Sequence, residues 1–292
     1  MSTIKSYSVG NGDMFYIDHN SDNFTIIDCY LPYDRQEEIL HDLANLCDQK
    51  GVNRFISTHP DDDHIRGLEH LDNRISIQNF YCVKNAATKP DKTDSFDRYC
   101  ALRDSDKAFL IKKACTRRWM NKKSDERGSS GINVLWPNTN NEQYKNALKM
   151  AEDGGSANNI SAIIKYSLDG GPSVLWMGDL ETEFMEAVKG DLNLLPVDIL
   201  FAPHHGRESG KIPDTMLTKL APKIIVVGEA PSEHLNYYKG YNTITQNSAG
   251  DIIFECEAGR VHVFTSNDCS VDFLCDESQN RKAWYYLGTL NL

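Results

Sequence analysis

A short apolar stretch that runs into a dense group of histidines and aspartates is the feature that most constrains this chain. Residues 52–56 have the pattern of a buried strand, and the segment His59-Pro60-Asp61-Asp62-Asp63-His64 follows almost at once. Carboxylates packed this closely repel one another, and burial makes the repulsion more costly. A divalent cation removes that cost, so the segment predicts a metal site at the end of a core strand. The alternative is a solvated acidic turn in which the two histidines are incidental.

The length of 292 residues, with 40% hydrophobic and 25% charged residues, is ordinary for a globular protein with a sizeable core. No linker interrupts the chain, so we expect a single domain over residues 1–292. No apolar run approaches the roughly 20 residues of a membrane span, and the first residues lack the apolar stretch of a signal peptide. The eight cysteines include no C-x-x-C pair, which favours a reducing compartment, here the cytoplasm, and disfavours a thiolate zinc site.

Positive charge is concentrated in one segment. Residues 84–127 contain 13 Lys and Arg against 7 Asp and Glu, although the whole chain has a net charge of −11. We expect a basic helical insertion at about 84–130, helical over 91–127, with a face that binds an anion such as a nucleic-acid backbone. The alternative is a lysine-rich helix that is merely well solvated. The predicted substrate-binding cations are Lys112, Lys113, Arg117 and Arg118.

Apolar runs and turn residues predict an α/β chain in which strands, a few helices and further strands follow one another without repeats. Such an order suggests two sheets packed between helices. Strands are expected over residues 7–9, 14–17, 24–28, 52–56, 75–83, 132–136, 159–168, 173–177, 197–201, 224–227, 251–256, 261–265 and 271–275. Helices are expected over 34–47, 91–127, 144–151, 183–188 and 213–220.

Polar side chains follow three of these strands directly. The carboxyl ends of parallel strands meet at one edge of a sheet, where open α/β sheets bind their ligands. A single Gly-Asp pair is often only a turn, and a His-His pair often has one buried and one exposed ring. The presence of all of these motifs in one chain is a specific indication of a metal site. The predicted metal ligands are His59, Asp61, Asp63, His64, Asp179, His204 and His205.

At these motifs the chain resembles the metallo-β-lactamase-fold hydrolases. The first motif of that family, H-x-H-x-D-H, appears with Asp61 in place of its second histidine, and Gly178-Asp179 and His204-His205-Gly206 match later motifs. The resemblance is closer to the soluble hydrolase domain of ComEC-type DNA-uptake proteins, which share a Gly-x-Gly-Asp turn (residues 10–13) and an Asn-x-Ser strand (residues 159–161). It extends from about residue 7 to 265 and is weakest over 84–130. It implies a metallo-β-lactamase-like αββα sandwich, two mixed β-sheets between helices.

The resemblance also implies two divalent metal ions. One would be held by His59, Asp61 and Asp179, with Asn159 standing near the place of a further histidine that most of the superfamily has. The other would be held by Asp63, His64, Asp179 and one of His204 and His205. Oxygen ligands in place of nitrogen favour Mn²⁺ or Mg²⁺ over Zn²⁺ in the first site. The spacing alone leaves the choice among these ions open.

Two such ions would supply an activated water and stabilise the attacking and leaving oxygens of an in-line displacement. Asp63 would act as ligand or proton acceptor, and whichever of His204 and His205 is not a ligand would contact the scissile phosphate. His234 would donate to the phosphate as well, or it is only a loop histidine. The predicted catalytic residues are thus Asp63, His205 and His234, and Asn159 joins the substrate-binding set.

The leading hypothesis is a metal-dependent phosphodiesterase or nuclease that acts on DNA. One alternative is hydrolysis of a small substrate, a cyclic nucleotide or a lactone, by the same centre; nucleic-acid binding would weaken steeply with salt, and small-substrate hydrolysis would not. The other is a binding or sensor module that has lost efficient chemistry, as the absent histidine suggests. The chain lacks a ComEC-type membrane channel, so we expect a free-standing relative without a membrane partner, which could serve in phage defence with a protein partner.

Overall fold

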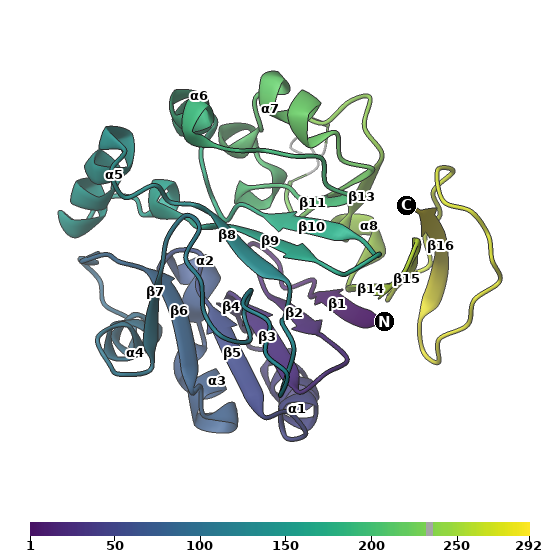
Figure 1. Cartoon of the computed structure of the whole chain (residues 1–292), viewed down its shortest axis with the longest axis horizontal. Coiled ribbons are helices and arrows are strands. Elements are labelled where there is room, and N and C mark those ends of the chain that lie inside the picture. Colours follow the sequence, from purple (N-terminus) through teal and green to yellow (C-terminus); the bar gives the residue numbers. More distant parts are fainter. Residues whose placement is uncertain (232–235) are drawn as a thin grey trace.

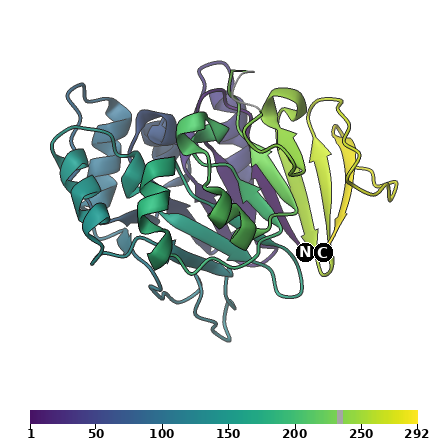
Figure 2. The same cartoon turned by 90° about the horizontal axis from the view of Figure 1, so that it is seen from above.

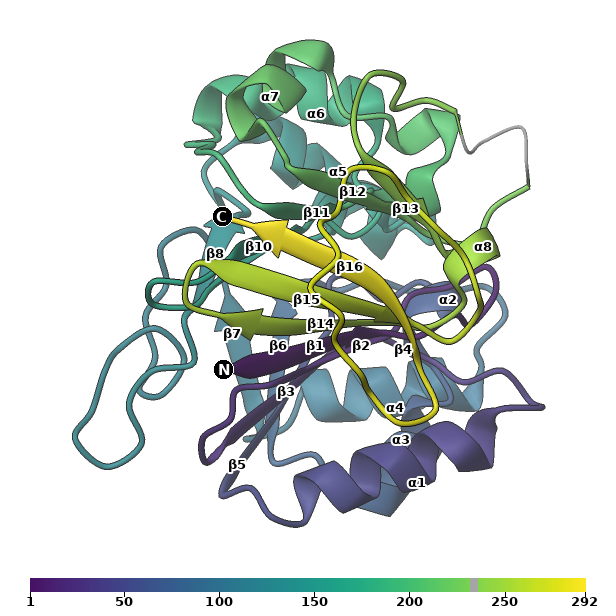
Figure 3. The ribbon, with the colours of Figure 1, turned by 90° about the vertical axis from the view of Figure 1, so that its right-hand side faces the viewer.

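The computed structural model describes residues 1–231 and 236–292 and arranges them in four layers (Figure 1). A nine-stranded and a six-stranded sheet face each other, and helices cover the outer face of each sheet. Figure 3 shows the two helical layers on opposite sides of the sheets, with α1, α3 and α4 on one side and α6 and α7 on the other. The expected sandwich of two mixed sheets between helices is therefore confirmed.

The nine-stranded sheet has the order β16-β15-β14-β1-β2-β3-β5-β6-β7. Strands β3, β5, β6 and β7 run parallel, so their carboxyl ends share one edge, and the remaining neighbours pair antiparallel. The strands are β1 (Ser2–Ser6), β2 (Phe15–Asp18), β3 (Asn23–Ile27), β5 (Val52–Ile56), β6 (Asn79–Val83), β7 (Ala108–Ile111), β14 (Ile252–Glu257), β15 (Arg260–Thr265) and β16 (Tyr285–Asn291). A two-residue strand, β4 (Cys29–Tyr30), follows β3.

The six-stranded sheet has the order β13-β12-β11-β10-β9-β8. Strands β10 to β13 are parallel neighbours, whereas β8 and β9 pair antiparallel at the other side. Its strands are β8 (Ile132–Trp136), β9 (Ile163–Ser167), β10 (Ser173–Trp176), β11 (Ile199–Phe201), β12 (Ile224–Val227) and β13 (Thr243–Thr245).

Helices α1 to α4 accompany the nine-stranded sheet, and α5 to α7 cover the six-stranded sheet, as the view in Figure 2 shows for the second group. The α-helices are α1 (Gln36–Cys47), α2 (Asp62–Ile65), α3 (Leu68–Ile75), α4 (Asp94–Arg103), α5 (Glu142–Glu152), α6 (Thr182–Val188), α7 (Asp214–Leu220) and α8 (Gln246–Ala249). Short 3-10 helices are η1 (Asn158–Ile160), η2 (Lys189–Asp191), η3 (His204–Gly206) and η4 (Glu208–Gly210).

The sheets are buried on both faces, which explains the continuous apolar runs of strands such as β5. Phe55 points toward the helices α1, α3 and α4, and its neighbour Ile56 points toward the other sheet. Between the sheets, Phe15 packs against Phe201 with ring centroids 4.7 Å apart and against Trp176 at 6.1 Å. Packing on both faces therefore fixes the carboxyl ends of β5, β10 and β11, and with them the positions of the residues that follow these strands.

Five secondary-structure predictions are wrong in whole or in part. The strand expected over 75–83 begins only at Asn79, because residues 68–75 form α3, and the strand expected over 159–168 begins at Ile163, after the 3-10 helix η1. The first strand covers Ser2–Ser6 and not residues 7–9, because it pairs with β14 from the far end of the chain. The helix expected over 91–127 ends at Arg103, and the last strand lies at Tyr285–Asn291 in place of 271–275. The segment 84–130 also contributes β7, which pairs in parallel with β6 and packs Phe109 against Tyr81 at 5.2 Å. That pairing with a distant strand outweighs the helical character of the segment.

No helix in the described part of the chain combines the length and the apolar character that a membrane crossing requires. All eight cysteines have free thiols in the described structure, and Cys29, Cys47, Cys82 and Cys256 are buried.

Candidate metal centre

Four strand ends converge at one edge of the sandwich. Segments that follow β3 and β5 come from the nine-stranded sheet, and segments that follow β10 and β11 come from the six-stranded sheet. Backbone hydrogen bonds tie them together: Asp28 N donates to Ile56 O (2.9 Å), and His204 N donates to Gly178 O (3.0 Å). The amino-terminal turn joins from another direction, because Asp13 N donates to Asp63 O (3.0 Å). Side chains far apart in sequence are thus gathered by main-chain contacts.

The ring of His64 is held between two carboxylates in the buried interior. Its Nδ1 lies 2.9 Å from Oδ2 of Asp28, and its Nε2 lies 2.9 Å from Oδ1 of Asp179. Asp28 is itself fixed, since it accepts hydrogen bonds from the backbone N (2.7 Å) and the hydroxyl (2.6 Å) of Thr58. A carboxylate on one ring nitrogen orients the other nitrogen and raises its basicity, which is the usual support of a metal-binding histidine.

Asp179 lies at the centre of the group. Its Oδ2 is 3.7 Å from Nε2 of His205 and 3.8 Å from Nε2 of His204, on the side away from His64. The turn that presents it depends on Gly178, which has φ +53°, and on Ser161, whose hydroxyl accepts a hydrogen bond from Asp179 N (3.0 Å). Asp179 therefore faces histidines that come from both sheets.

The structure distinguishes the two adjacent histidines, both of which have positive φ. The side chain of His205 is fully buried, with Nδ1 3.1 Å from Oδ1 of Asp13 and Nε2 3.4 Å from Oδ2 of Asp63. His204 lies at the rim with 14% of its side chain exposed, and its Nδ1 is 2.9 Å from the hydroxyl of Ser209. His205 is thus the one placed among the predicted ligands and supported by a carboxylate.

Three buried ligand atoms in this group have no hydrogen bond within the described structure: Nε2 of His59, Nε2 of His64 and Oδ1 of Asp179. The last two are 2.9 Å apart but are not oriented as donor and acceptor. An unsatisfied buried polar atom costs about 1–3 kcal/mol, so three in one place indicate a missing shared partner. One ligand atom from each of His59, Asp63, His64 and Asp179 lies within 4.8 Å of the others, and Asp13, His64 and His205 form a second such group. Imidazole and carboxylate donors of this kind fit a divalent ion.

Neighbouring carboxylates raise the pKa values of two of the histidines. Burial alone would lower the pKa of His64, but Asp179 and Asp28 outweigh burial and raise that pKa above its ordinary value. Asp13 and Asp179 likewise outweigh burial and raise the pKa of His205 to about 10. The pKa of His59 shifts the other way, because burial and the neighbouring His64 lower it. Protons and a cation compete for such ligands, so binding of a metal ion must release protons.

We expect EDTA-treated protein to release about one proton or more per metal ion bound at pH 7. A raised histidine pKa stabilises the folded state below the unfolded value near 6.5, and this contribution is lost as pH rises through the folded value, about 10 for His205. The EDTA-treated protein should therefore lose stability between about pH 7 and 10, and metal-loaded protein should not. Calorimetry in buffers of different ionisation enthalpy counts the protons. His205→Gln should lower the count, whereas substitution of the exposed His41 by Gln should leave it unchanged; equal counts for both variants would contradict the assignment.

The remaining predicted site residues lie in several places. Asp61 is at the rim, with Oδ2 3.7 Å from Nε2 of His59 and its other oxygen in contact with Lys89. Asn159 is engaged elsewhere: its amide nitrogen donates to Glu181 Oε2 (2.7 Å) and its oxygen accepts from Glu181 N (3.1 Å). The structure therefore does not turn Asn159 toward the ligand cluster. His234 lies outside the described residues.

The four predicted substrate-binding cations are not gathered on one face. Arg117 stacks on the rings of Tyr81 and Phe109 and donates to Asn79 at the start of β6, the end of the sheet opposite the cluster. Arg118 pairs with Glu126 (2.9 Å). Lys112 and Lys113 follow the carboxyl end of β7 and are exposed, although Lys113 also donates to the backbone oxygen of Asp191.

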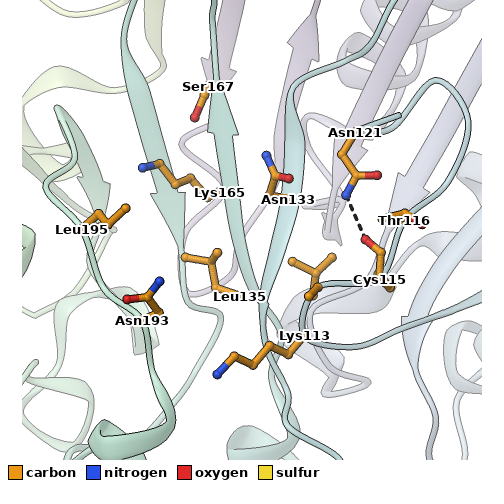
Figure 4. Close-up of a pocket in the computed structure, with 12 residues that line it drawn as sticks. Lys113, Cys115, Thr116, Asn121, Asn133, Leu135, Lys165, Ser167, Asn193 and Leu195 are labelled. Atoms are coloured by element: carbon orange, nitrogen blue, oxygen red, sulfur yellow. Dashed lines mark hydrogen bonds between the residues drawn. The ribbon is translucent and has the colours of Figure 1, made fainter. Parts of the chain in front are cut away.

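A cavity of about 510 Å³ lies beside Lys113 (Figure 4). Lys165, Asn133 and Leu135 line it from β8 and β9, and the amide of Asn121 closes one side by donating to Cys115 O (2.9 Å). None of its lining residues belongs to the predicted ligands. It is therefore separate from the candidate metal centre.

Asp28 and Asp13 are functional candidates that the sequence reasoning did not select. Asp28 follows an apolar strand in the same way as Asp179, so the same signal could have identified it. Asp13 belongs to the Gly-x-Gly-Asp turn, which matched the family pattern without a role for its carboxylate. No local sequence feature indicates the contact between Lys89 and Asp61.

Comparison with models of known protein families gives no match, and comparison with curated protein sequences gives none either. Among solved structures, Igni18, described as a novel metallo hydrolase from the hyperthermophilic archaeon Ignicoccus hospitalis, is similar with a TM-score of 0.52 and 16% sequence identity. The similarity covers 87% of this chain and 99% of that chain.

Two metallo-β-lactamases are similar with lower scores. A B3 enzyme with an active-site glutamic acid has a TM-score of 0.42, 15% identity, and coverage of 74% of this chain and 90% of its own. SMB-1, solved with mercaptoacetic acid, has a TM-score of 0.39, 11% identity, and coverage of 74% and 85%. Identities this low concern the fold alone. The chain has a metallo-β-lactamase-like αββα fold, as expected, with a His/Asp cluster at the edge where its strands end.

Proposed function

We propose that the chain is a divalent-metal-dependent phosphodiesterase that acts on nucleic acid, with DNA as the first substrate to test. The observation that carries the proposal is the convergence of three buried ligand atoms without hydrogen bonds, on His59, His64 and Asp179. The resemblance of the motifs to ComEC-type hydrolase domains supports a phosphodiester as substrate. Asp63, His64, Asp179 and His205 would hold an ion, and the two-ion expectation would add a position beside His59 and Asp61.

A divalent ion bound here would lower the pKa of a water molecule toward about 7 and polarise a phosphoryl oxygen. Side chains of the protein would position the substrate and accept the proton that the attacking water loses. Burial alone would raise the pKa of Asp63, but the contacts with His205 and His64 lower that pKa below its ordinary value. Asp63 is therefore ionised at neutral pH and available as a metal ligand, whereas the lowered pKa makes it a weak proton acceptor, so of its two predicted roles the shift favours the ligand.

Donors for a substrate phosphate are present at the rim. If Ser209 donates to Nδ1 of His204, the proton of that ring is on Nε2, which points to the cluster side and can donate to a phosphate oxygen. Arg207, half-buried two residues after His205, contacts Asn11 of the amino-terminal turn and adds a positive charge. These two side chains form the candidate phosphate-binding group, to which His234 would be added by the sequence prediction.

A second candidate, hydrolysis of a small anionic substrate, is favoured by one specific observation. Arg117 and Arg118 make contacts within the chain, so the basic segment does not present one continuous cationic surface. His204 and Arg207 alone would suffice for a compact ligand such as a cyclic nucleotide.

The test is to treat the protein with EDTA and to add back Mn²⁺, Mg²⁺ or Zn²⁺ in the presence of plasmid, single-stranded DNA, RNA or bis-p-nitrophenyl phosphate. We expect at least one ion to restore phosphodiester cleavage, with cleavage of DNA falling steeply as salt increases. Reversal of the exposed Lys112 and Lys113 to Glu should weaken DNA cleavage and spare bis-p-nitrophenyl phosphate, and the same change at Arg118 is the matched control. A lactone is assayed in parallel, and its hydrolysis without any phosphodiester cleavage would contradict the proposal.

A further inference from the structure

A lysine contacts one of the predicted metal ligands. The ammonium of Lys89 is bound to Oδ1 of Asp61, while Oδ2 of the same carboxylate lies 3.7 Å from Nε2 of His59. The two side chains are largely buried, with 24% and 17% of their surfaces exposed. The positive charge therefore lies directly on the His59–Asp61 side of the cluster.

The backbone holds this lysine in place. Its neighbour Thr88 is anchored to the end of α5, because Thr88 N donates to Ala151 O (3.0 Å) and the Thr88 hydroxyl donates to Glu152 O (2.8 Å). The residue before Thr88, Ala87, is buried in the core between the sheets. A lysine that directly follows two anchored residues loses less backbone freedom when it forms an ion pair than a lysine on a mobile loop.

The two sides of the cluster offer different numbers of ligands. In the division that the resemblance implies, Asp179 is shared by two ion positions. One position adds Asp63, His64 and His205 to it, which makes four ligands. The other side has His59 and Asp61, and Asp61 already shares its charge with Lys89. The segment before β9 that would supply a further ligand presents Asn159, whose amide is bound to Glu181. Protein metal sites normally use three or more protein ligands. The second position reaches three only if Asp61 joins His59 and the shared Asp179, so the contact of Asp61 with Lys89 leaves it deficient.

We propose that the Lys89 ammonium takes the place of a second metal ion, so that the centre holds one tightly bound divalent ion and one fixed lysine charge. The inference depends on the metal centre of the proposed function and concerns its composition. A cation on Asp61 offsets the charge that would attract a second ion and repels that ion at short range. Lys89 is a positioning residue here, because it acts through Asp61.

The test uses Lys89→Met, which removes the charge and keeps a chain of similar length, and Lys89→Arg, which keeps the charge. Lys92→Met, in the same loop and exposed, is the matched control. After Mn²⁺ loading and dialysis, elemental analysis should find about one ion per chain in the wild type, Lys89→Arg and Lys92→Met, and about two in Lys89→Met. Electron paramagnetic resonance should change in Lys89→Met alone from the spectrum of an isolated Mn²⁺ to that of a coupled pair.

Each of the other possible results would contradict the proposal. Two ions in the wild type would show that the lysine does not exclude the second ion, and the proposed function would stand. One ion or fewer in Lys89→Met would show that Lys89 supports Asp61 as a ligand or has no influence on the count. No metal bound by any variant would overturn the inference and the metal-dependent function together.

Discussion

Alanine at position 179 should reduce hydrolysis of bis-p-nitrophenyl phosphate by about 10³-fold or more and abolish tight metal binding. Asp179 faces His64 at 2.9 Å through one oxygen and His205 at 3.7 Å through the other, so its removal takes a ligand from the middle of the cluster. Lewis-acid stabilisation by a bound ion is worth several kcal/mol in the transition state, and each 1.36 kcal/mol corresponds to a factor of about ten. Steady-state kinetics and metal analysis after dialysis measure the two effects.

The control for this prediction is Asp169→Ala, at an exposed position in the turn between β9 and β10, which should leave activity and metal content unchanged. Asp179→Asn keeps the shape of the side chain and tests whether a loss of activity comes from unfolding. Circular dichroism of both variants should match the wild type. Turnover like that of the wild type in Asp179→Ala would mean that the reactive centre lies elsewhere.

Gly178→Ala should destabilise the protein by about 2–5 kcal/mol and weaken metal binding. Gly178 has φ +53°, and a methyl group there would lie 2.7 Å from the Ser161 hydroxyl and 3.0 Å from Cβ of Thr58. Both neighbours are fully buried and bonded, Ser161 to Asp179 N and Thr58 to Asp28, so they cannot move without disturbing the cluster. Urea unfolding of metal-loaded protein measures the loss.

Gly259→Ala separates steric contact from backbone strain. Gly259 also has positive φ, +78°, but no atom lies within 4 Å of an added methyl group. We expect a loss of only about 1–2 kcal/mol, from the left-handed conformation, and unchanged metal affinity. Equal losses in the two variants would show that contact with Ser161 does not matter.

A general rule of sheets explains why the sequence placed several of these side chains together, while their role as metal ligands stays a prediction. His64, Asp179 and His205 each follow an apolar run, and parallel strands bring such ends to one edge. Asp28 follows an apolar strand as Asp179 does, and it was missed because, unlike Gly178-Asp179, it matches none of the family motifs. Lys89 could not be predicted, since its place depends on the contact of its loop with the end of α5, more than 60 residues further along the chain.

Three of the wrong secondary-structure predictions share a physical cause, which is pairing between distant segments. Residues 108–111 lie in a segment of helical composition, yet they extend the sheet because the edge of β6 is available to them. The final strand, Tyr285–Asn291, pairs with β15 through a register shift near Gly288, a pattern that local alternation does not reveal. Long-range pairing of this kind is a property of the whole fold and leaves a weak trace in any short window.

The division of the predicted ligands between two sheets affects how readily the protein would be degraded in a cell. His64 follows β5 of one sheet and Asp179 follows β10 of the other, so an ion bound by both would cross-link the sandwich at its edge. Anything that binds the folded state alone makes local opening rarer. During metal starvation this edge would open more often, and proteases would reach the ends of β5 and β10 first. The abundance of the protein would then follow the supply of the ion.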